Sequence, residues 1–221
     1  MKRYEIMNIF PQVSPEHYRK LGYLGQDRWA SYGNQVRELI RLKPANILEV
    51  GIGNGIVRDA LRDLGFAVTT VDIDSGLSPD YIASVSALPF PNDSFDAVLA
   101  AEILEHLPFE DFPKALAEIH RVARRYVYIA LPHAGAVFSL NVKMPLLPRL
   151  ILFFKIPFFW KQHIFNGEHY WELGKRDFPV SRIKTAMKKA GFNIREAGID
   201  PADPAHYFFS LIKHGKSSSI R

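Results

Sequence analysis

The sequence predicts an α/β protein in which a mostly parallel sheet carries helices on both faces. Two observations support this fold class. Short apolar, β-branched runs alternate along the chain with segments whose apolar residues recur at helical spacing. The run at residues 47–50 also leads through a glycine-rich turn, "GIGNG", straight into a helical pattern. Strand, helix and strand in repetition form parallel sheets with helices on both sides.

The first elements have clear sequence signals. An amphipathic helical segment at 16–42, broken near "GYLG", ends before Pro44, since a proline disfavours helical backbone in the residue before it. The first strand follows at 47–50. Apolar residues at helical spacing then fill 54–64, and Gly65 caps the end of that helix.

The later elements continue the alternation. Further strands are expected at 66–74, 81–85, 97–102 and 126–132, and the last two at 193–199 and 206–213. The other helices are expected at 111–122 and 181–191.

Composition narrows the class of protein. The 221 residues, 48% hydrophobic and 23% charged, suit one domain with a full core. No cysteine is present, which excludes disulfides, a thiolate metal site and a cysteine nucleophile. The start has no signal-peptide pattern, and no run of about 18 apolar residues follows. We therefore expect a cytoplasmic protein. The net charge of +5 is mild.

The glycine turn predicts a nucleotide site, because ligands of such sheets bind beyond the carboxyl ends of the strands. A dinucleotide fold requires G-x-G-x-x-G, whereas Ile56 stands where the third glycine would be. Glu49, two residues before Gly51, would repel a pyrophosphate but attract an ammonium or sulfonium group. This favours S-adenosylmethionine. Asp72 ends the second strand and suits a carboxylate that accepts both ribose hydroxyls.

The motifs "ILEVGIGNG", "VDID", "SALPFPNDSFDAVLAAEILEHL" and "EIHRVARRYVYIALP", in this order, resemble class I S-adenosylmethionine-dependent methyltransferases of the methyltransferase type 11 kind. The resemblance covers roughly residues 45–132. It implies a Rossmann-like three-layer sandwich with a seven-stranded, mostly parallel sheet and an antiparallel last strand. It also implies S-adenosyl-L-methionine as the cofactor, over the ends of the first, second and fourth strands.

The resemblance also implies cofactor-binding residues. The group around the methionine part would be Glu49, Gly51, Gly53 and Gly55, with Asp72 on the ribose and Ile73, Ser84 and Val85 around the adenine. Ser84 departs from the family pattern, in which many relatives have Asp. In "EILEHL", Glu102, Glu105 and His106 would lie near the cofactor, although they could also simply start a helix, whose positive end the two acids would stabilise.

The expected organisation is an N-terminal helical cap at 1–44 and a methyltransferase domain at 45–214. An apolar, basic insertion at about 134–178 would cover the acceptor pocket as a lid. Residues 215–221 are expected to be a disordered tail.

The part of this insertion at 143–165 is rich in aromatic residues and lysine, and residues 119–167 contain no acidic residue. Three interpretations stay open: a lid, peripheral contact with a membrane surface, or a helical hairpin that packs on the sheet or forms a homodimer. Nucleic acid is disfavoured, since the lysines are spaced through an apolar run rather than along a polar face.

Methyl transfer requires proximity and alignment, and it needs a base only when the acceptor carries a proton. His133, just past the fifth strand, and His169, after the lid, are the expected catalytic bases. His163, His169 and Glu172 have metal-ligand chemistry, but their spacing demands no metal.

These observations predict a methyltransferase that acts on a small-molecule or lipid-like acceptor. Two alternatives are an NAD(P)-binding oxidoreductase and a non-catalytic cofactor-binding protein that associates with membranes.

Overall fold

The computed structural model describes residues 11–146, 148 and 150–213. A seven-stranded sheet with the order β3-β2-β1-β4-β5-β9-β8 forms the centre of the molecule. Neighbouring strands from β3 to β5 run parallel, whereas β9 runs antiparallel to both β5 and β8. The predicted α/β fold, with its antiparallel last strand, is confirmed.

The strands lie close to their expected positions. They are β1 (Asn46–Val50), β2 (Ala67–Asp72), β3 (Tyr81–Ile82), β4 (Phe95–Ala101), β5 (Ala123–Pro132), β8 (Phe192–Asp200) and β9 (Asp203–Lys213). The third strand is shorter than expected, because the chain turns at Ala83 toward the ends of the other strands and pairs with β2 over only two residues.

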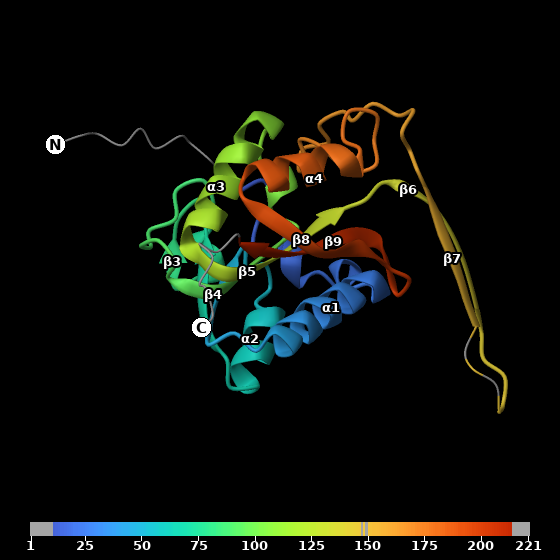
Figure 1. Cartoon of the computed structure of the whole chain (residues 1–221), viewed down its shortest axis with the longest axis horizontal. Helices are drawn as coiled ribbons and strands as arrows, with labels where there is room; N and C mark the ends of the chain where they lie inside the picture. The colour runs from blue at the N-terminus through green and yellow to red at the C-terminus, as the bar shows by residue number, and fades with distance from the viewer. Residues whose placement is uncertain (1–10, 147, 149, 214–221) are drawn as a thin grey trace, which may run out of the picture.

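Helices cover both faces of the sheet (Figure 1). On one face lie α1 (Gln26–Leu42) and α2 (Ile56–Asp63), whose Leu39, Val57 and Leu61 form one buried cluster. On the other face lie α3 (Phe112–Val122) and α4 (Val180–Lys189) over a larger cluster. Successive strand residues alternate between the two clusters, as the pleat requires. The sheet is therefore the middle layer of three. None of the described helices is long and apolar enough to cross a membrane.

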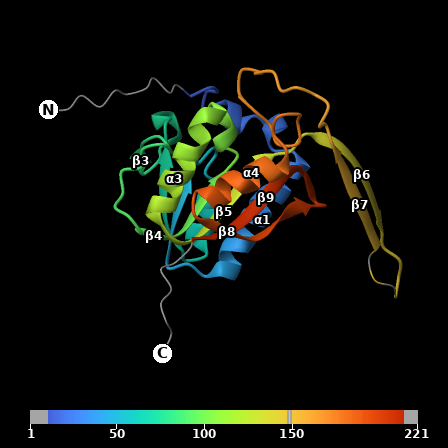
Figure 2. The same ribbon diagram turned by 45° about the horizontal axis from the view of Figure 1, so that its top comes forward.

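The insertion after β5 differs from the helical hairpin considered above. It forms a two-stranded antiparallel sheet of β6 (Gly135–Val142) and β7 (Leu150–Pro157) that projects from the body (Figures 1 and 2). We call this pair the ribbon. The segment Leu150–Phe154 is apolar at every position, so it has no period by which helix and strand can be told apart, and its aromatic and β-branched residues favour strand.

The segment before α1 consists of the short 3-10 turns η1 (His17–Arg19) and η2 (Leu21–Tyr23). α1 ends at Leu42, and its C-cap Lys43 has a left-handed backbone (φ 48°) just before Pro44. Residues 1–10 of the expected cap and the expected tail at 215–221 lie outside the described residues.

Candidate functional site

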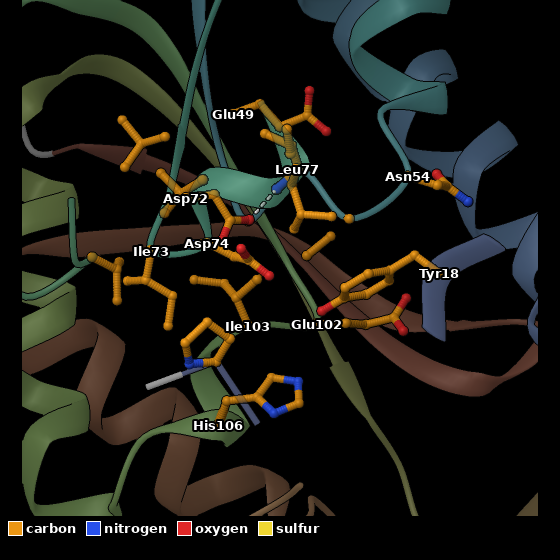
Figure 3. Close-up of a pocket in the computed structure, with 18 of the residues that line it drawn as sticks. Tyr18, Glu49, Asn54, Asp72, Ile73, Asp74, Leu77, Glu102, Ile103 and His106 are labelled. Carbon is orange, nitrogen blue, oxygen red and sulfur yellow. Dashed lines mark hydrogen bonds between the residues drawn. The ribbon is translucent and has the colours of Figure 1, made fainter. Parts of the chain in front are cut away.

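A pocket opens at the carboxyl ends of β1, β2 and β4, the place where the sequence predicts a cofactor (Figure 3). The residues after these strands form its floor, and the segment from Pro11 to α1 supplies one wall with Tyr18, Tyr23 and Arg28. Glu49, Gly51, Gly53, Asp72, Ile73, Ser84, Val85 and Glu102 all line it. Distant parts of the chain meet here because parallel strands end at one edge of the sheet.

The glycine turn has the backbone that only glycine adopts readily. Gly51, Gly53 and Gly55 have φ values of 80°, 50° and 76°. A Cβ on Gly51 would collide with the side chain of Ile103, and one on Gly53 would touch the ring of Tyr18 at 3.5 Å. Gly55 lies at the start of α2 and is not among the residues that line the pocket. It shapes the turn.

Glu49 is buried in β1 with 4% of its surface exposed, and its Oε2 atom has no hydrogen-bond partner. Burial raises the pKa of this carboxyl to about 8, although the charges of Arg58 and Arg62 act in the opposite direction. A buried acid without a partner is costly unless a ligand supplies one. Glu49 therefore favours a ligand that brings a positive charge or hydrogen-bond donors.

Asp72 ends β2, and both of its carboxylate oxygens are held. Oδ2 accepts from the backbone N–H of Ile52 and Oδ1 from that of Asp74, each at 2.9 Å. Burial raises the pKa of Asp72, and these hydrogen bonds oppose the shift. Each oxygen keeps a second lone pair for a ligand hydroxyl. Ile73 adds an apolar wall beside it (Figure 3).

Ser84 and Val85 line the same side of the pocket. The hydroxyl of Ser84 accepts from the backbone N–H of Ser86 at 3.2 Å, so it is turned toward its own loop. Val85 is buried. Both residues were expected around an adenine, and Val85 belongs to the larger apolar cluster.

Glu102 follows β4 with a left-handed backbone (φ 56°). Its carboxylate pairs with Arg28 of α1 and accepts from Ser31 at 3.2 Å. His206 of β9 lies 3.1 Å away through Nε2, and its Nδ1 is 2.6 Å from Asp203. Glu102 therefore closes the end of the pocket as part of a fixed charge network. Arg28, Ser31 and His206 thus already provide partners for the carboxylate of Glu102.

His133 lies elsewhere. It lines a second pocket at the base of the ribbon, together with Lys155, and is not among the residues that line the first pocket. Its ring is 6% exposed, neither nitrogen has a hydrogen-bond partner, and Tyr207 packs edge-on against it. Burial and the charge of Lys155 lower the pKa of His133 to about 4. The geometry does not bring this predicted base to the cofactor pocket.

His169 is better placed. Its ring packs edge-on against His106, which lines the cofactor pocket, at a centroid distance of 5.1 Å. Its Nδ1 lies 3.3 Å from Glu172. Burial alone would lower the pKa of His169, but Glu172 and the nearby Glu105 raise it above its usual value.

Several residues of the site were not predicted from the sequence. Tyr18 covers the glycine turn, Arg28 pairs with Glu102, and His206 reaches Glu102 from the last strand. The partners are far apart in sequence, so no local spacing could reveal them. The aromatic cluster of "EHYRKLGY" was the only available signal for Tyr18.

The residues present fit S-adenosylmethionine. The unpartnered oxygen of Glu49 can accept from a cationic or donor group, Asp72 offers two oriented acceptors, and Ile73, Leu77 and Val85 form an apolar wall. These features match, in that order, the amino-acid part, the ribose and the base of the cofactor.

Comparison with known proteins agrees with this assignment. Residues 48–131 match the family model described as "Methyltransferase domain". The "Ubiquinone biosynthesis O-methyltransferase" of Paramagnetospirillum magneticum is 28% identical over 102 residues, which cover 40% of this chain and 41% of that protein. The protein of the same name from Parvibaculum lavamentivorans is 23% identical over 198 residues, covering 80% of this chain and 70% of that one.

Among solved structures, the 1,6-didemethyltoxoflavin-N1-methyltransferase of Burkholderia thailandensis, crystallised with S-adenosylhomocysteine, aligns with a TM-score of 0.56. The alignment covers 93% of each chain at 18% identity, so it compares the folds alone. Residues 48–131 therefore match a methyltransferase domain in sequence, and the fold of the chain is that of the class I S-adenosylmethionine-dependent methyltransferase with which it aligns.

Proposed function

We propose that this chain transfers a methyl group from S-adenosylmethionine to a small-molecule or lipid-like acceptor. The observation that carries the proposal is the buried, unpartnered carboxyl oxygen of Glu49 at the glycine turn, in the same pocket as Asp72. When bound, the cofactor supplies a methyl group on a positively charged sulfur.

The side chains of the pocket would bind the cofactor and align it with the acceptor. Asp72 is oriented by two backbone N–H groups, so it can accept ribose hydroxyls without losing its position. Tyr18 lies over Gly53, which narrows access of water to the turn. Glu102 is fixed after the end of β4 by Arg28 and His206. Such positioning is the main contribution that a displacement at carbon requires.

An NAD(P)-dependent oxidoreductase is disfavoured by two features. Ile56 occupies the place of the third glycine, and α2 begins there. Glu49 puts an acidic group at the turn where a pyrophosphate would need donors, whereas Asp72 would suit the ribose of either cofactor. The relatives and the solved structure named above are methyltransferases.

Calorimetric titration separates these functions. We expect heat from S-adenosylhomocysteine and none from NAD, and we expect Asp72→Asn to weaken the first titration. Glu110→Gln serves as the matched control, because Glu110 is exposed on the loop before α3. Heat with NAD alone would refute the proposal.

The ribbon supports a second proposal, contact with an anionic membrane surface. Ile151 and Leu152 are consecutive, so their side chains point to opposite faces, and both are about half exposed. A protein partner or a lid would cover one face, whereas lipid surrounds both. Phe138 and Phe154 stack at 5.1 Å across the two strands and are 49% and 53% exposed. The absence of acidic residues over 119–167 suits anionic lipid.

Flotation with vesicles tests this second proposal. We expect the protein to float with vesicles that contain phosphatidylglycerol and less with neutral phosphatidylcholine. The double variant Phe138→Ser and Phe154→Ser should stay in the lower fraction. Leu64→Ser is the matched control, since Leu64 is equally exposed on the body of the protein. Unchanged flotation of the double variant would refute the ribbon's role.

The remaining assignments stay predictions. They are a base role for His133 or His169, a lid role for the ribbon, a homodimer and a cytoplasmic location. Among the described residues that line the cofactor pocket, none belongs to the ribbon.

A further inference from the structure

Glu105 is the most unusual buried group outside the cofactor contacts. It lies in the short 3-10 turn η4 (Leu104–His106) after β4, with 1% of its surface exposed. Neither carboxyl oxygen has a hydrogen-bond partner among the described residues. A buried carboxyl without any partner carries a large desolvation cost, and native proteins rarely leave one without a bound group.

Two imidazole rings face this carboxyl from different parts of the chain. His106 is its neighbour in η4, and His169 comes from the loop after the ribbon. One ligand atom from each of the three residues lies within 4.8 Å of the others. The backbone holds the loop in place, because the N–H of Tyr170 donates to the carbonyl of Glu105 at 2.9 Å.

One nitrogen of each ring lies close to an oxygen atom that orients the ring. Nδ1 of His106 lies 2.9 Å from the carbonyl of Glu168, and Nδ1 of His169 lies 3.3 Å from Glu172. This leaves Nε2 of each ring without a hydrogen bond among the described residues. Histidine ligands of metals are typically held in this way, with one nitrogen on a carbonyl or carboxylate and the other on the ion.

We propose that Glu105, His106 and His169 bind a divalent transition-metal ion, with Zn²⁺ as the best match. Two imidazoles and a carboxylate are a common ligand set for zinc with an open coordination position. Ligand atoms around zinc lie about 3 to 3.5 Å apart. The three side chains therefore close slightly around the ion, while the backbone keeps its course.

Other charged groups at this place are already paired. Glu102 is held by Arg28 and His206, so it does not complete the ligand set. The set of His163, His169 and Glu172 is also disfavoured. Nε2 of His163 contacts the carbonyl of His169 at 2.9 Å, and its Nδ1 contacts Lys175 at 3.0 Å.

The proposed site adjoins the cofactor pocket, because His106 lines both. An ion there would bind an oxygen of the methyl acceptor and lower the pKa of its hydroxyl. This step rests on the proposed function and narrows the acceptor to an oxygen-bearing class. Metal binding itself does not depend on it. His169 then acts as a metal ligand rather than as the base predicted from the sequence.

Metal binding to the full chain tests the proposal. The protein is treated with EDTA, freed of chelator and titrated with ZnCl₂, and bound zinc is counted after dialysis. We expect one equivalent, and visible absorption typical of a low-coordinate site when Co²⁺ replaces zinc. Glu105→Gln and His169→Gln should each weaken binding at least about tenfold. Glu110→Gln and His120→Gln are matched controls, since Glu110 is exposed and His120 packs against Phe192 away from the cluster.

Two results would overturn the site: no bound zinc at millimolar ZnCl₂, or binding that persists in both ligand variants. Circular dichroism of each variant shows whether it folds, and His169→Gln decides the question if Glu105→Gln does not. S-adenosylhomocysteine is titrated into the same samples. Cofactor binding without zinc binding rejects the metal site alone, whereas zinc binding without cofactor binding rejects the proposed function alone.

Discussion

Replacing Glu49 with glutamine should stabilise the protein while weakening cofactor binding. Glu49 has a pKa of about 8, against 4.5 in the unfolded chain, because of its burial. The folded state therefore holds a proton that the unfolded state releases between these two values. The stability contributed by this group is complete below pH 4.5 and is lost as the pH rises toward 8.

The size of this loss in unfolding free energy follows from the pKa shift of Glu49. At about 1.4 kcal/mol per pKa unit, the loss is about 3 kcal/mol at pH 7 and under about 1 kcal/mol at pH 5. Glutamine cannot ionise and avoids this loss. Any fixed cost of its buried amide is the same at both pH values, so the change with pH isolates the titration of Glu49.

Urea unfolding at pH 5, 7 and 8 measures the effect. The difference in unfolding free energy between Glu49→Gln and the unmodified chain should grow with pH, whereas Glu110→Gln should show no such trend. A difference that stays constant from pH 5 to pH 8 would refute the reasoning.

Calorimetry in buffers of different ionisation enthalpy gives an independent test of Glu49. At pH 7 only about one tenth of Glu49 is ionised when the protein is unliganded. The α-ammonium group of S-adenosylhomocysteine would favour the ionised form of Glu49, so binding of this compound at pH 7 should release up to about one proton. Glu49→Gln should release none and bind more weakly. Equal proton release from both proteins would show that Glu49 does not titrate with the ligand.

Four further changes test other parts of the site. Asp72→Asn should weaken S-adenosylhomocysteine binding about tenfold or more in calorimetry, because it removes an anionic acceptor of two hydroxyls; a loss below about threefold would count against its ribose role. Gly51→Ala should cost about 1–3 kcal/mol in urea unfolding, through positive φ and the collision with Ile103. Adding Ile103→Ala should recover only the part due to the collision, and full recovery would exclude backbone strain. Lys155→Met should speed chymotrypsin cleavage of the ribbon severalfold, since Lys155 donates to the carbonyls of His133 and Pro204 at its base; unchanged cleavage would mean that other contacts hold the ribbon. His133→Ala should leave cofactor affinity within about threefold, because the ring lines the other pocket; unchanged turnover would then remove it as a base.

The cofactor side of the site was predictable because its residues lie where strands end. Glu49, Gly51 and Asp72 belong to segments whose secondary structure is clear from the sequence, and a parallel sheet brings such segments to one edge. Only two facts were needed, the order of the strands and the spacing from each strand to its polar residue.

The ribbon was not predictable in the same way. β7 is apolar at every position from Leu150 to Phe154 and shows no alternation there, so Ile151 and Leu152 gave no sign of which side would be buried. In fact both are exposed. Hydrophobic patterning predicts a fold on the assumption that apolar residues enter the core, and this segment breaks that assumption. That break is itself a reason to expect an external partner for the ribbon.

The acceptor side depends on pairings that sequence spacing does not encode. Tyr170 reaches Glu105, and the carbonyl of Glu168 reaches His106, across more than sixty residues. The same loop carries His169, whose sequence position suggests only a base. Placed beside an unpartnered Glu105, the same imidazole becomes a metal ligand, because its Nδ1 is held by Glu172 and its other nitrogen is not. The chemical role of a histidine thus depends on the partner of each ring nitrogen. The zinc titration of His169→Gln tests this role directly, since a base would be lost without any change in bound metal.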